Sequence, residues 1–266
     1  MTSETTPPPG KWSDLAQRML SGGLAAALGL WLMWLGGVPF KLLVSAVVGI
    51  MVWEVARMVG AMRLALPLGA LSAVIMVALA LLPTGLVLPL VFLPGLIGVS
   101  QFKKYRVRFA VFSTAVLISG IGLFSLRENF GFIWMLWLAL VVIASDVLGY
   151  FAGRVIGGPK FWPKVSPKKT WSGTLAGWLG AALIGVYYMV TGHAGVESIG
   201  ISIAVAIAGQ MGDVAESALK RTVGVKDSSS ILPGHGGMFD RFDSMLGASL
   251  FLLLVGQIID FPPVPM

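Results

Sequence analysis

The sequence predicts an all-α, polytopic integral membrane protein with about nine transmembrane helices and a cytoplasmic amino terminus. First, the 266 residues are 56% hydrophobic and 12% charged, with a mean hydropathy of +0.87, whereas soluble domains carry about 25% charged residues. Second, apolar runs long enough to cross about 30 Å of hydrocarbon follow one another with short breaks. Third, Lys and Arg gather in alternate breaks, as in membrane proteins generally.

The amino-terminal tail, 1–18, is polar and rich in proline. No basic segment precedes a short apolar core there, so we expect no cleaved signal peptide. Residues 19–266 are predicted to form one membrane-embedded domain. Its expected spans are 20–36, 38–58, 64–83, 86–101, 108–126, 130–153, 173–191, 198–221 and 245–261.

The span at 86–101 is the weakest, because it is short and contains Pro89 and Pro94. A broken or re-entrant helix is tolerated where protein rather than lipid surrounds it. The sequence leaves open whether this segment crosses the membrane.

The distribution of basic residues predicts the orientation. Of the 19 Lys and Arg residues, 17 fall in the tail and every second loop, and only Lys41 and Arg127 fall on the opposite side. This predicts a cytoplasmic amino terminus and explains the net charge of +7 through contact with anionic membrane lipids. Nucleic-acid binding is not expected, because no basic module interleaved with aromatic residues is present. Cysteine is absent, so any metal is expected to bind through oxygen.

The segment 213–243 holds five of the twelve carboxylates in the chain. Asp213 and Glu216 are three residues apart at the cytoplasmic end of the span 198–221, so they share one helix face. Carboxylates beside cations suit a Mg²⁺ ion that bridges phosphates. The alternative is a Glu216–Lys220 pair that only stabilises the helix end. The same face continues with Ser217, Lys220 and Arg221.

A glycine-containing loop follows, between Lys226-Asp227 and Asp240-Arg241-Phe242-Asp243. Gly236 and Gly237 allow backbone amides to approach an anion closely. The loop could return Asp240 and Asp243 to Asp213 and so complete a metal site. His235 is interpreted as a phosphate contact or a loop-ordering residue rather than a general base, because a phosphate monoester is already ionised near neutral pH.

A second polar region surrounds the span 130–153. Asp146 lies within an apolar run, which marks a functional residue or a structural partner for a buried Arg or Ser. The loop after it combines hydroxyl, ammonium and amide donors suited to phosphate oxygens. These donors are Ser166, Lys168, Lys169, Thr170 and Gly173.

Glu54 and Arg57 are three residues apart near the cytoplasmic end of the span 38–58, and we interpret them as a helix-end ion pair. No Walker A motif, Rossmann fingerprint or Gly-x-Ser-x-Gly elbow is present.

The pattern Ser217-x-x-Lys220-Arg221, then Lys226-Asp227, then Pro233-Gly-His235-Gly-Gly237 and Asp240-Arg241-x-Asp243 resembles the signature of the phosphatidate cytidylyltransferases. Upstream, Asp146-x3-Tyr150-x2-Gly153-Arg154 and Ser166-Pro-Lys-Lys-Thr-Trp-Ser-Gly173 resemble a second region of that family. The family pattern has Glu where this chain has Ser172, so Ser172 is left out of the expected metal ligands. The similarity is specific for the signature region 146–243.

The resemblance implies a catalytic domain that forms CDP-diacylglycerol and pyrophosphate from CTP and phosphatidic acid with Mg²⁺. It also implies a second, monovalent ion such as K⁺ and a homodimer. The alternation of basic loops predicts an active site on the cytoplasmic side of a bacterial inner membrane or its equivalent. The predicted catalytic residues are Asp213, Asp240, Asp243, Lys220, Arg221, Lys226, Asp227 and His235. The predicted substrate-binding residues are Asp146, Ser166, Lys168, Lys169, Thr170, Gly173, Ser217, Gly236, Gly237 and Arg241. The predicted metal ligands are Asp213, Asp240, Asp243 and Glu216.

Two other functions stay open at this point. One is a transporter or channel in which Asp146, Asp213 and Glu216 line an ion path, although the two halves of the chain show no convincing repeat. The other is a CTP-dependent kinase acting on a lipid alcohol, which would release CDP instead of pyrophosphate.

Overall fold

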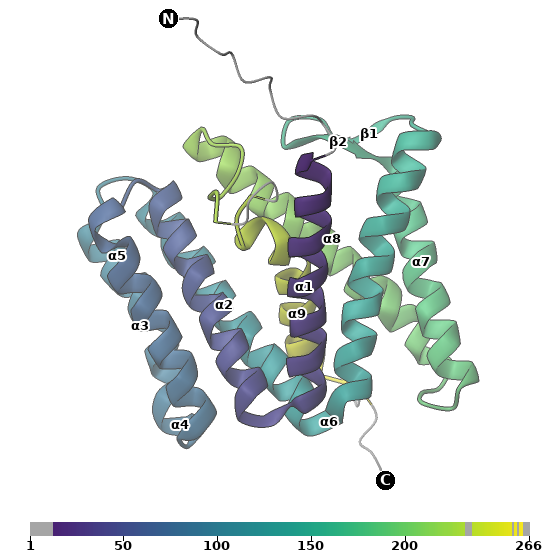
Figure 1. Cartoon of the computed structure of the whole chain (residues 1–266), viewed down its shortest axis with the longest axis horizontal. Helices are drawn as coiled ribbons and strands as arrows, with labels where there is room; N and C mark the ends of the chain where they lie inside the picture. Colours follow the sequence, from purple (N-terminus) through teal and green to yellow (C-terminus); the bar gives the residue numbers. More distant parts are fainter. Residues whose placement is uncertain (1–12, 232–235, 257, 260, 263–266) are drawn as a thin grey trace, which may run out of the picture.

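The computed structural model describes residues 13–231, 236–256, 258–259 and 261–262. Most of this part of the chain is helical, as Figure 1 shows. The helices are α1 (Ser13–Leu35), α2 (Gly37–Met58), α3 (Met62–Leu81), α4 (Thr84–Val87), the 3-10 helix η1 (Leu88–Phe92), α5 (Leu93–Gln101), α6 (Arg106–Val155), α7 (Trp171–Val190), α8 (Glu197–Val223) and α9 (Phe239–Val255).

The long helices have the length and composition of membrane spans. Outward-facing apolar side chains such as Leu66 and Leu86 are largely exposed, which suits contact with lipid tails. The predicted multi-pass helical membrane protein is confirmed at this level. Within the described residues, six segments are long and apolar enough to cross a bilayer, namely Gly37–Met58, Met62–Leu81, Thr84–Gln101, Arg106–Val155, Trp171–Val190 and Glu197–Val223.

The two predicted spans at 108–126 and 130–153 lie in one 50-residue element, α6. Gly131 interrupts it with φ 84° and ψ −173°, a conformation that glycine adopts readily because it has no Cβ. Before Gly131, α6 packs against α5 and α9; after it, α6 packs against α7. A single glycine therefore redirects the chain between two groups of helices.

The segment 86–101, which the sequence left open as a span or a broken or re-entrant helix, is divided into α4, η1 and α5. Pro89 lies in η1, and Pro94 lies in the first turn of α5. Proline lacks the backbone N–H that a helix interior needs, so both positions suit helix beginnings.

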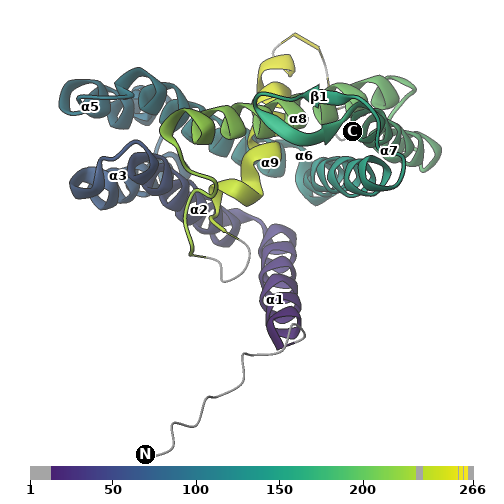
Figure 2. The same ribbon diagram turned by 90° about the horizontal axis from the view of Figure 1, so that it is seen from above.

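Figure 1 shows α2, α3 and α5 on one side of the molecule and α7 on the other, with α9 between them. Seen from above in Figure 2, α1 projects away from the remaining helices. Arg127 of α6 attaches the end of α1, because its Nε donates to the Met33 carbonyl at 2.7 Å and its Nη2 donates to the Trp34 carbonyl at 2.9 Å.

The all-α prediction missed one small sheet. Strands β1 (Lys160–Trp162) and β2 (Ser166–Thr170) pair antiparallel, with Lys160 opposite Thr170 and Trp162 opposite Ser166. The hairpin lies between α6 and α7 at the end of the molecule where α1 begins (Figure 1). Strand β2 contains Lys168 and Lys169, the lysines predicted to bind phosphate, and α7 begins directly after it.

Candidate active site

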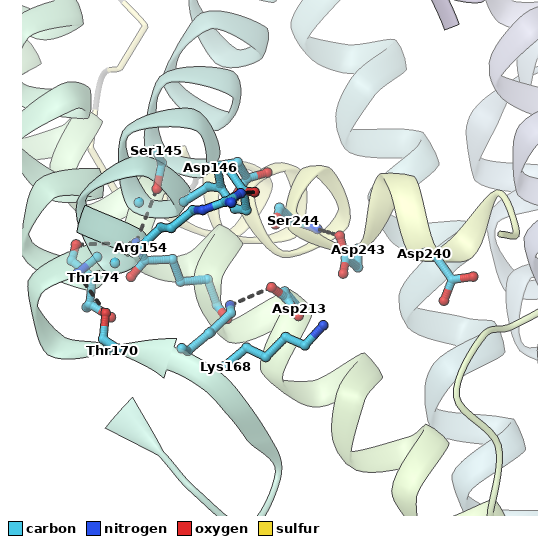
Figure 3. Close-up of a pocket in the computed structure, with 16 residues that line it drawn as sticks. Ser145, Asp146, Arg154, Lys168, Thr170, Thr174, Asp213, Asp240, Asp243 and Ser244 are labelled. Atoms are coloured by element: carbon cyan, nitrogen blue, oxygen red, sulfur yellow. Dashed lines mark hydrogen bonds and ion pairs between the residues drawn. The ribbon is translucent and has the colours of Figure 1, made fainter. Parts of the chain in front are cut away.

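A polar cavity of about 470 Å³ lies where α6, α7, α8, α9 and strand β2 meet (Figure 3). Both predicted polar regions contribute to it, although they are far apart in the sequence. Eight predicted site residues line it, namely Asp146, Lys168, Lys169, Thr170, Gly173, Asp213, Asp240 and Asp243. The other lining residues are Ser145, Gly149, Tyr150, Gly153, Arg154, Thr174, Gln210 and Ser244.

Close packing of α8 against α9 brings acids from the two helices together. A Cβ on Gly212 would overlap the carbonyl oxygen of Asp243 and would lie 3.1 Å from the Gly247 Cα. A Cβ on Gly247 would in turn lie 3.0 Å from the Gly212 Cα. Only glycines permit this approach, which is typical of small residues at membrane helix interfaces. Asp213 follows one of these glycines directly, so its position depends on the contact.

Three of the four predicted metal ligands form a cluster. One carboxylate oxygen from each of Asp213, Glu216 and Asp243 lies within 4.8 Å of the others. Asp213 and Glu216 share a face of α8, as their spacing predicted. Three convergent carboxylates match the oxygen preference of Mg²⁺, so the donor set fits the expected ion.

Asp240, the fourth predicted ligand, is occupied by other partners, although it lines the cavity. Its Oδ1 lies 2.7 Å from the Lys220 Nζ. Its Oδ2 accepts hydrogen bonds from the Ser228 amide at 2.9 Å, the Ser228 hydroxyl at 2.9 Å and the Gly237 amide at 2.7 Å. Asp240 thus organises the segment before α9, and in Figure 3 it lies to one side of Asp213 and Asp243.

Lys220 of α8 connects Glu216 of the acidic cluster with Asp240 of α9. Its Nζ is 2.6 Å from the Glu216 Oε2 as well as 2.7 Å from Asp240. The helix pair considered from the sequence therefore exists, but it belongs to a larger network. Because the Lys220 and Glu216 side chains are only 12% and 2% exposed, this cation offsets buried negative charge.

Basic groups border the cavity on the side of the hairpin. The Lys169 Nζ lies 2.5 Å from the Asp213 Oδ2 and donates to the Gln210 carbonyl at 3.4 Å. Lys168 is exposed at the rim. Arg154 of α6, which donates to the Tyr150 hydroxyl at 2.7 Å, also lines the cavity. Cations from two elements can therefore face one polyanion in the cavity.

The first turn of α7 also borders the cavity. The Thr170 hydroxyl caps the helix by accepting from the Gly173 amide at 3.2 Å. Ser172, which stands where the family pattern has Glu, bonds to Thr170 and to the Gly157 carbonyl. A helix amino terminus favours anions, so this end of α7 suits the phosphate contacts predicted for the loop.

Several predicted residues lie elsewhere. Ser217 donates to Asp213 at 3.3 Å and supports the cluster from outside the cavity. Gly236 and Gly237 belong to the segment bound by Asp240. His235 lies outside the described residues. Five more predicted residues do not line the cavity and are exposed or partly exposed, namely Ser166, Arg221, Lys226, Asp227 and Arg241.

The prediction of a Glu54–Arg57 ion pair is wrong. Glu54 is buried and binds the segment around α9 instead, through Ser229, Met238 and Phe239. Arg57 lies over the Trp53 ring, 4.6 Å from its centroid. A lone acid within an apolar helix was the signal that could have revealed this role.

The fold and the cavity together define a multi-pass helical membrane protein whose acidic cavity is bordered by basic side chains. The profile of the cytidylyltransferase family matches residues 16–259. The phosphatidate cytidylyltransferase of Brucella suis biovar 1 (strain 1330) is 35% identical over 262 residues, which cover 95% of this chain and 97% of the relative. That of Bacillus subtilis (strain 168) is 31% identical over 286 residues, with 90% and 96% covered. The chain belongs to the cytidylyltransferase family, as its signature predicted.

Proposed function

We propose that this protein is a phosphatidate cytidylyltransferase, which transfers CMP from CTP to phosphatidic acid and releases pyrophosphate. The observation that carries the proposal is a cavity lined both by acids from α6, α8 and α9 and by basic groups from β2 and α6. Both substrates are polyanions, and one of them is anchored in lipid. A polar cavity at one end of a helical membrane domain suits that pair.

The residues of the chain account for most of the chemistry. Lys168, Lys169 and Arg154 would hold the phosphates of the two substrates and offset their mutual repulsion. A phosphate oxygen of phosphatidic acid forms the new bond to the α-phosphorus of CTP, and the bond to the pyrophosphate oxygen breaks. The attacking oxygen is already ionised near neutral pH, so no general base is needed.

Asp213, Glu216 and Asp243 would hold Mg²⁺. When bound, the ion supplies positive charge that stabilises the phosphates during transfer. A monovalent ion such as K⁺ at the same centre stays a prediction, as does a homodimer.

The proposal also includes the number of membrane crossings and the side of the membrane on which the cavity lies. Dividing α6 at Gly131 and including α1 and α9 with the six candidate spans gives nine crossings, the number predicted from the sequence. Their alternation would place the cavity, the hairpin and the start of α1 on the same, cytoplasmic side of a bacterial inner membrane or its equivalent. The loops rich in Lys and Arg support this orientation.

The test is a product analysis with purified protein in mixed micelles of phosphatidic acid and detergent, with CTP labelled in its α- or γ-phosphate. We expect α-label in CDP-diacylglycerol and γ-label in pyrophosphate, and no product after chelation of Mg²⁺. Release of CDP with transfer of γ-label to lipid would replace the proposal with a lipid kinase. Ion flux in liposomes without any CTP-dependent product would replace it with a transporter.

A further inference from the structure

Glu54 of α2 is a buried carboxylate whose partners lie at least 175 residues away in the sequence. Its Oε1 accepts from the Ser229 hydroxyl at 2.5 Å and from the Met238 amide at 2.9 Å. Its Oε2 accepts from the Phe239 amide at 2.7 Å. Both oxygens are therefore directed at the amino-terminal end of α9 and the chain before it.

The amides that Glu54 binds are those that a helix cannot satisfy by itself, because the first four N–H groups of a helix have no partner within it. An ionised acceptor at this end also interacts favourably with the helix dipole. In the described chain α9 has no side-chain cap of its own. A side chain from α2 supplies the cap instead.

Asp240 binds neighbouring residues of the same region, because its Oδ2 accepts from the Ser228 and Gly237 amides. The two carboxylates alternate along the chain, since Asp240 binds Ser228 and Gly237 while Glu54 binds Ser229 and Met238. A Cβ on Gly237 would overlap both Ser228 and Glu54, so Gly237 fits tightly between these two side chains. Its position is set from two elements at once.

We infer that Glu54 is a positioning residue for nucleotidyl transfer. It does not line the cavity, but it fixes the point at which α9 begins and so the placement of Asp240 and Asp243 relative to Asp213. The inference rests on the proposed function. Because a displacement of about 1 Å at a catalytic group can cost roughly 100-fold in rate, loss of this cap should lower kcat more than it weakens substrate binding.

The experiment compares Glu54→Gln with Glu197→Gln. Glu197 is the control, because it also accepts a hydrogen bond from a backbone amide, that of Gly195 at 2.9 Å. It lies at the amino-terminal end of α8, whereas Asp213 and Glu216 lie in the carboxyl-terminal half of that helix. We expect Glu54→Gln to lower kcat roughly 10- to 100-fold with KM for CTP changed less than about threefold. Glu54→Asp, which keeps the charge, should recover part of the rate, and Glu197→Gln should match the wild type.

Hydrogen–deuterium exchange reports on the bonds directly. Peptides containing Met238 and Phe239 should exchange faster in Glu54→Gln, and peptides from α7 should not change. A wild-type kcat in folded Glu54→Gln overturns the inference, and so does an equal loss of apparent CTP affinity and rate.

If Glu54→Gln does not fold, the kcat values of Ser229→Ala and Glu54→Asp test the positioning role instead. Each should lower kcat roughly fivefold at unchanged KM, and wild-type rates in both would refute the positioning role. The wild-type protein separates this inference from the proposed function: if it forms no CDP-diacylglycerol, the function fails, whereas an active wild type with equally active variants contradicts only the role of Glu54.

Discussion

Replacing Lys220 with methionine should destabilise the protein strongly, because it removes the cation between two buried acids. Its Nζ lies 2.6 Å from Glu216 and 2.7 Å from Asp240, and the three side chains are 12%, 2% and 10% exposed. Removing one partner of a buried ion pair typically costs about 3–5 kcal/mol. Asp240 keeps its bonds to Ser228 and Gly237, so we expect the lower end, about 3 kcal/mol.

The pair Lys41–Glu128 is a matched control. Its 2.5 Å separation is as short, but Glu128 is 44% exposed, and exposed ion pairs contribute about 1 kcal/mol or less. The assay is unfolding of each variant in detergent, followed by tryptophan fluorescence. The double variant Lys220→Met with Glu216→Gln should recover at least about 1 kcal/mol, because it no longer buries an unpaired carboxylate. Equal losses for Lys41→Met and Lys220→Met would refute the argument that burial sets the magnitude.

Three further changes test the cavity. Asp243→Asn should lower turnover by roughly 1000-fold while the protein still inserts and folds; near-normal formation of CDP-diacylglycerol would remove Asp243 from the metal site. Lys169→Ala should raise KM for CTP roughly tenfold, because it removes a charged contact, and Lys164→Ala, on the turn of the hairpin, should not. Gly212→Ala should push α8 from α9 and abolish most activity, whereas Gly200→Ala, where a Cβ meets open space, should be silent; similar rates for the two alanine variants would contradict the packing argument.

The helical class and the residues of the cavity were predictable to different degrees. Apolar length identified most spans, and the spacing of Asp213 and Glu216 identified one acidic face, because both are local properties of a helix. The break between the spans 108–126 and 130–153 was also predicted, but the sequence did not show that Gly131 makes it within one 50-residue element rather than a loop. The short hairpin was missed because its lysines and prolines lack the alternating pattern of a strand.

The contact partners of individual side chains were harder to predict from the sequence. Asp240 was predicted as a metal ligand from its place in the signature, but its contacts with Ser228 and Gly237 depend on how the loop folds back. Glu54 was assigned to its nearest opposite charge, Arg57, because sequence shows only near neighbours. Tertiary packing decides such pairings. Glu54 and Phe239 are 185 residues apart, so no local sequence pattern indicates their hydrogen bond.

The cap that Glu54 places on α9 has a consequence for how the chain can be divided. Every residue that lines the cavity lies between Ser145 and Ser244, so a fragment beginning at α6 would contain the complete set of chemical groups. It would nevertheless lack the acid that anchors α9 and the helices that hold that acid in place. The first hundred residues carry no signature motif, but they hold α9 in place through Glu54. We therefore expect the fragment beginning at α6 to be active only when the fragment before it is bound noncovalently.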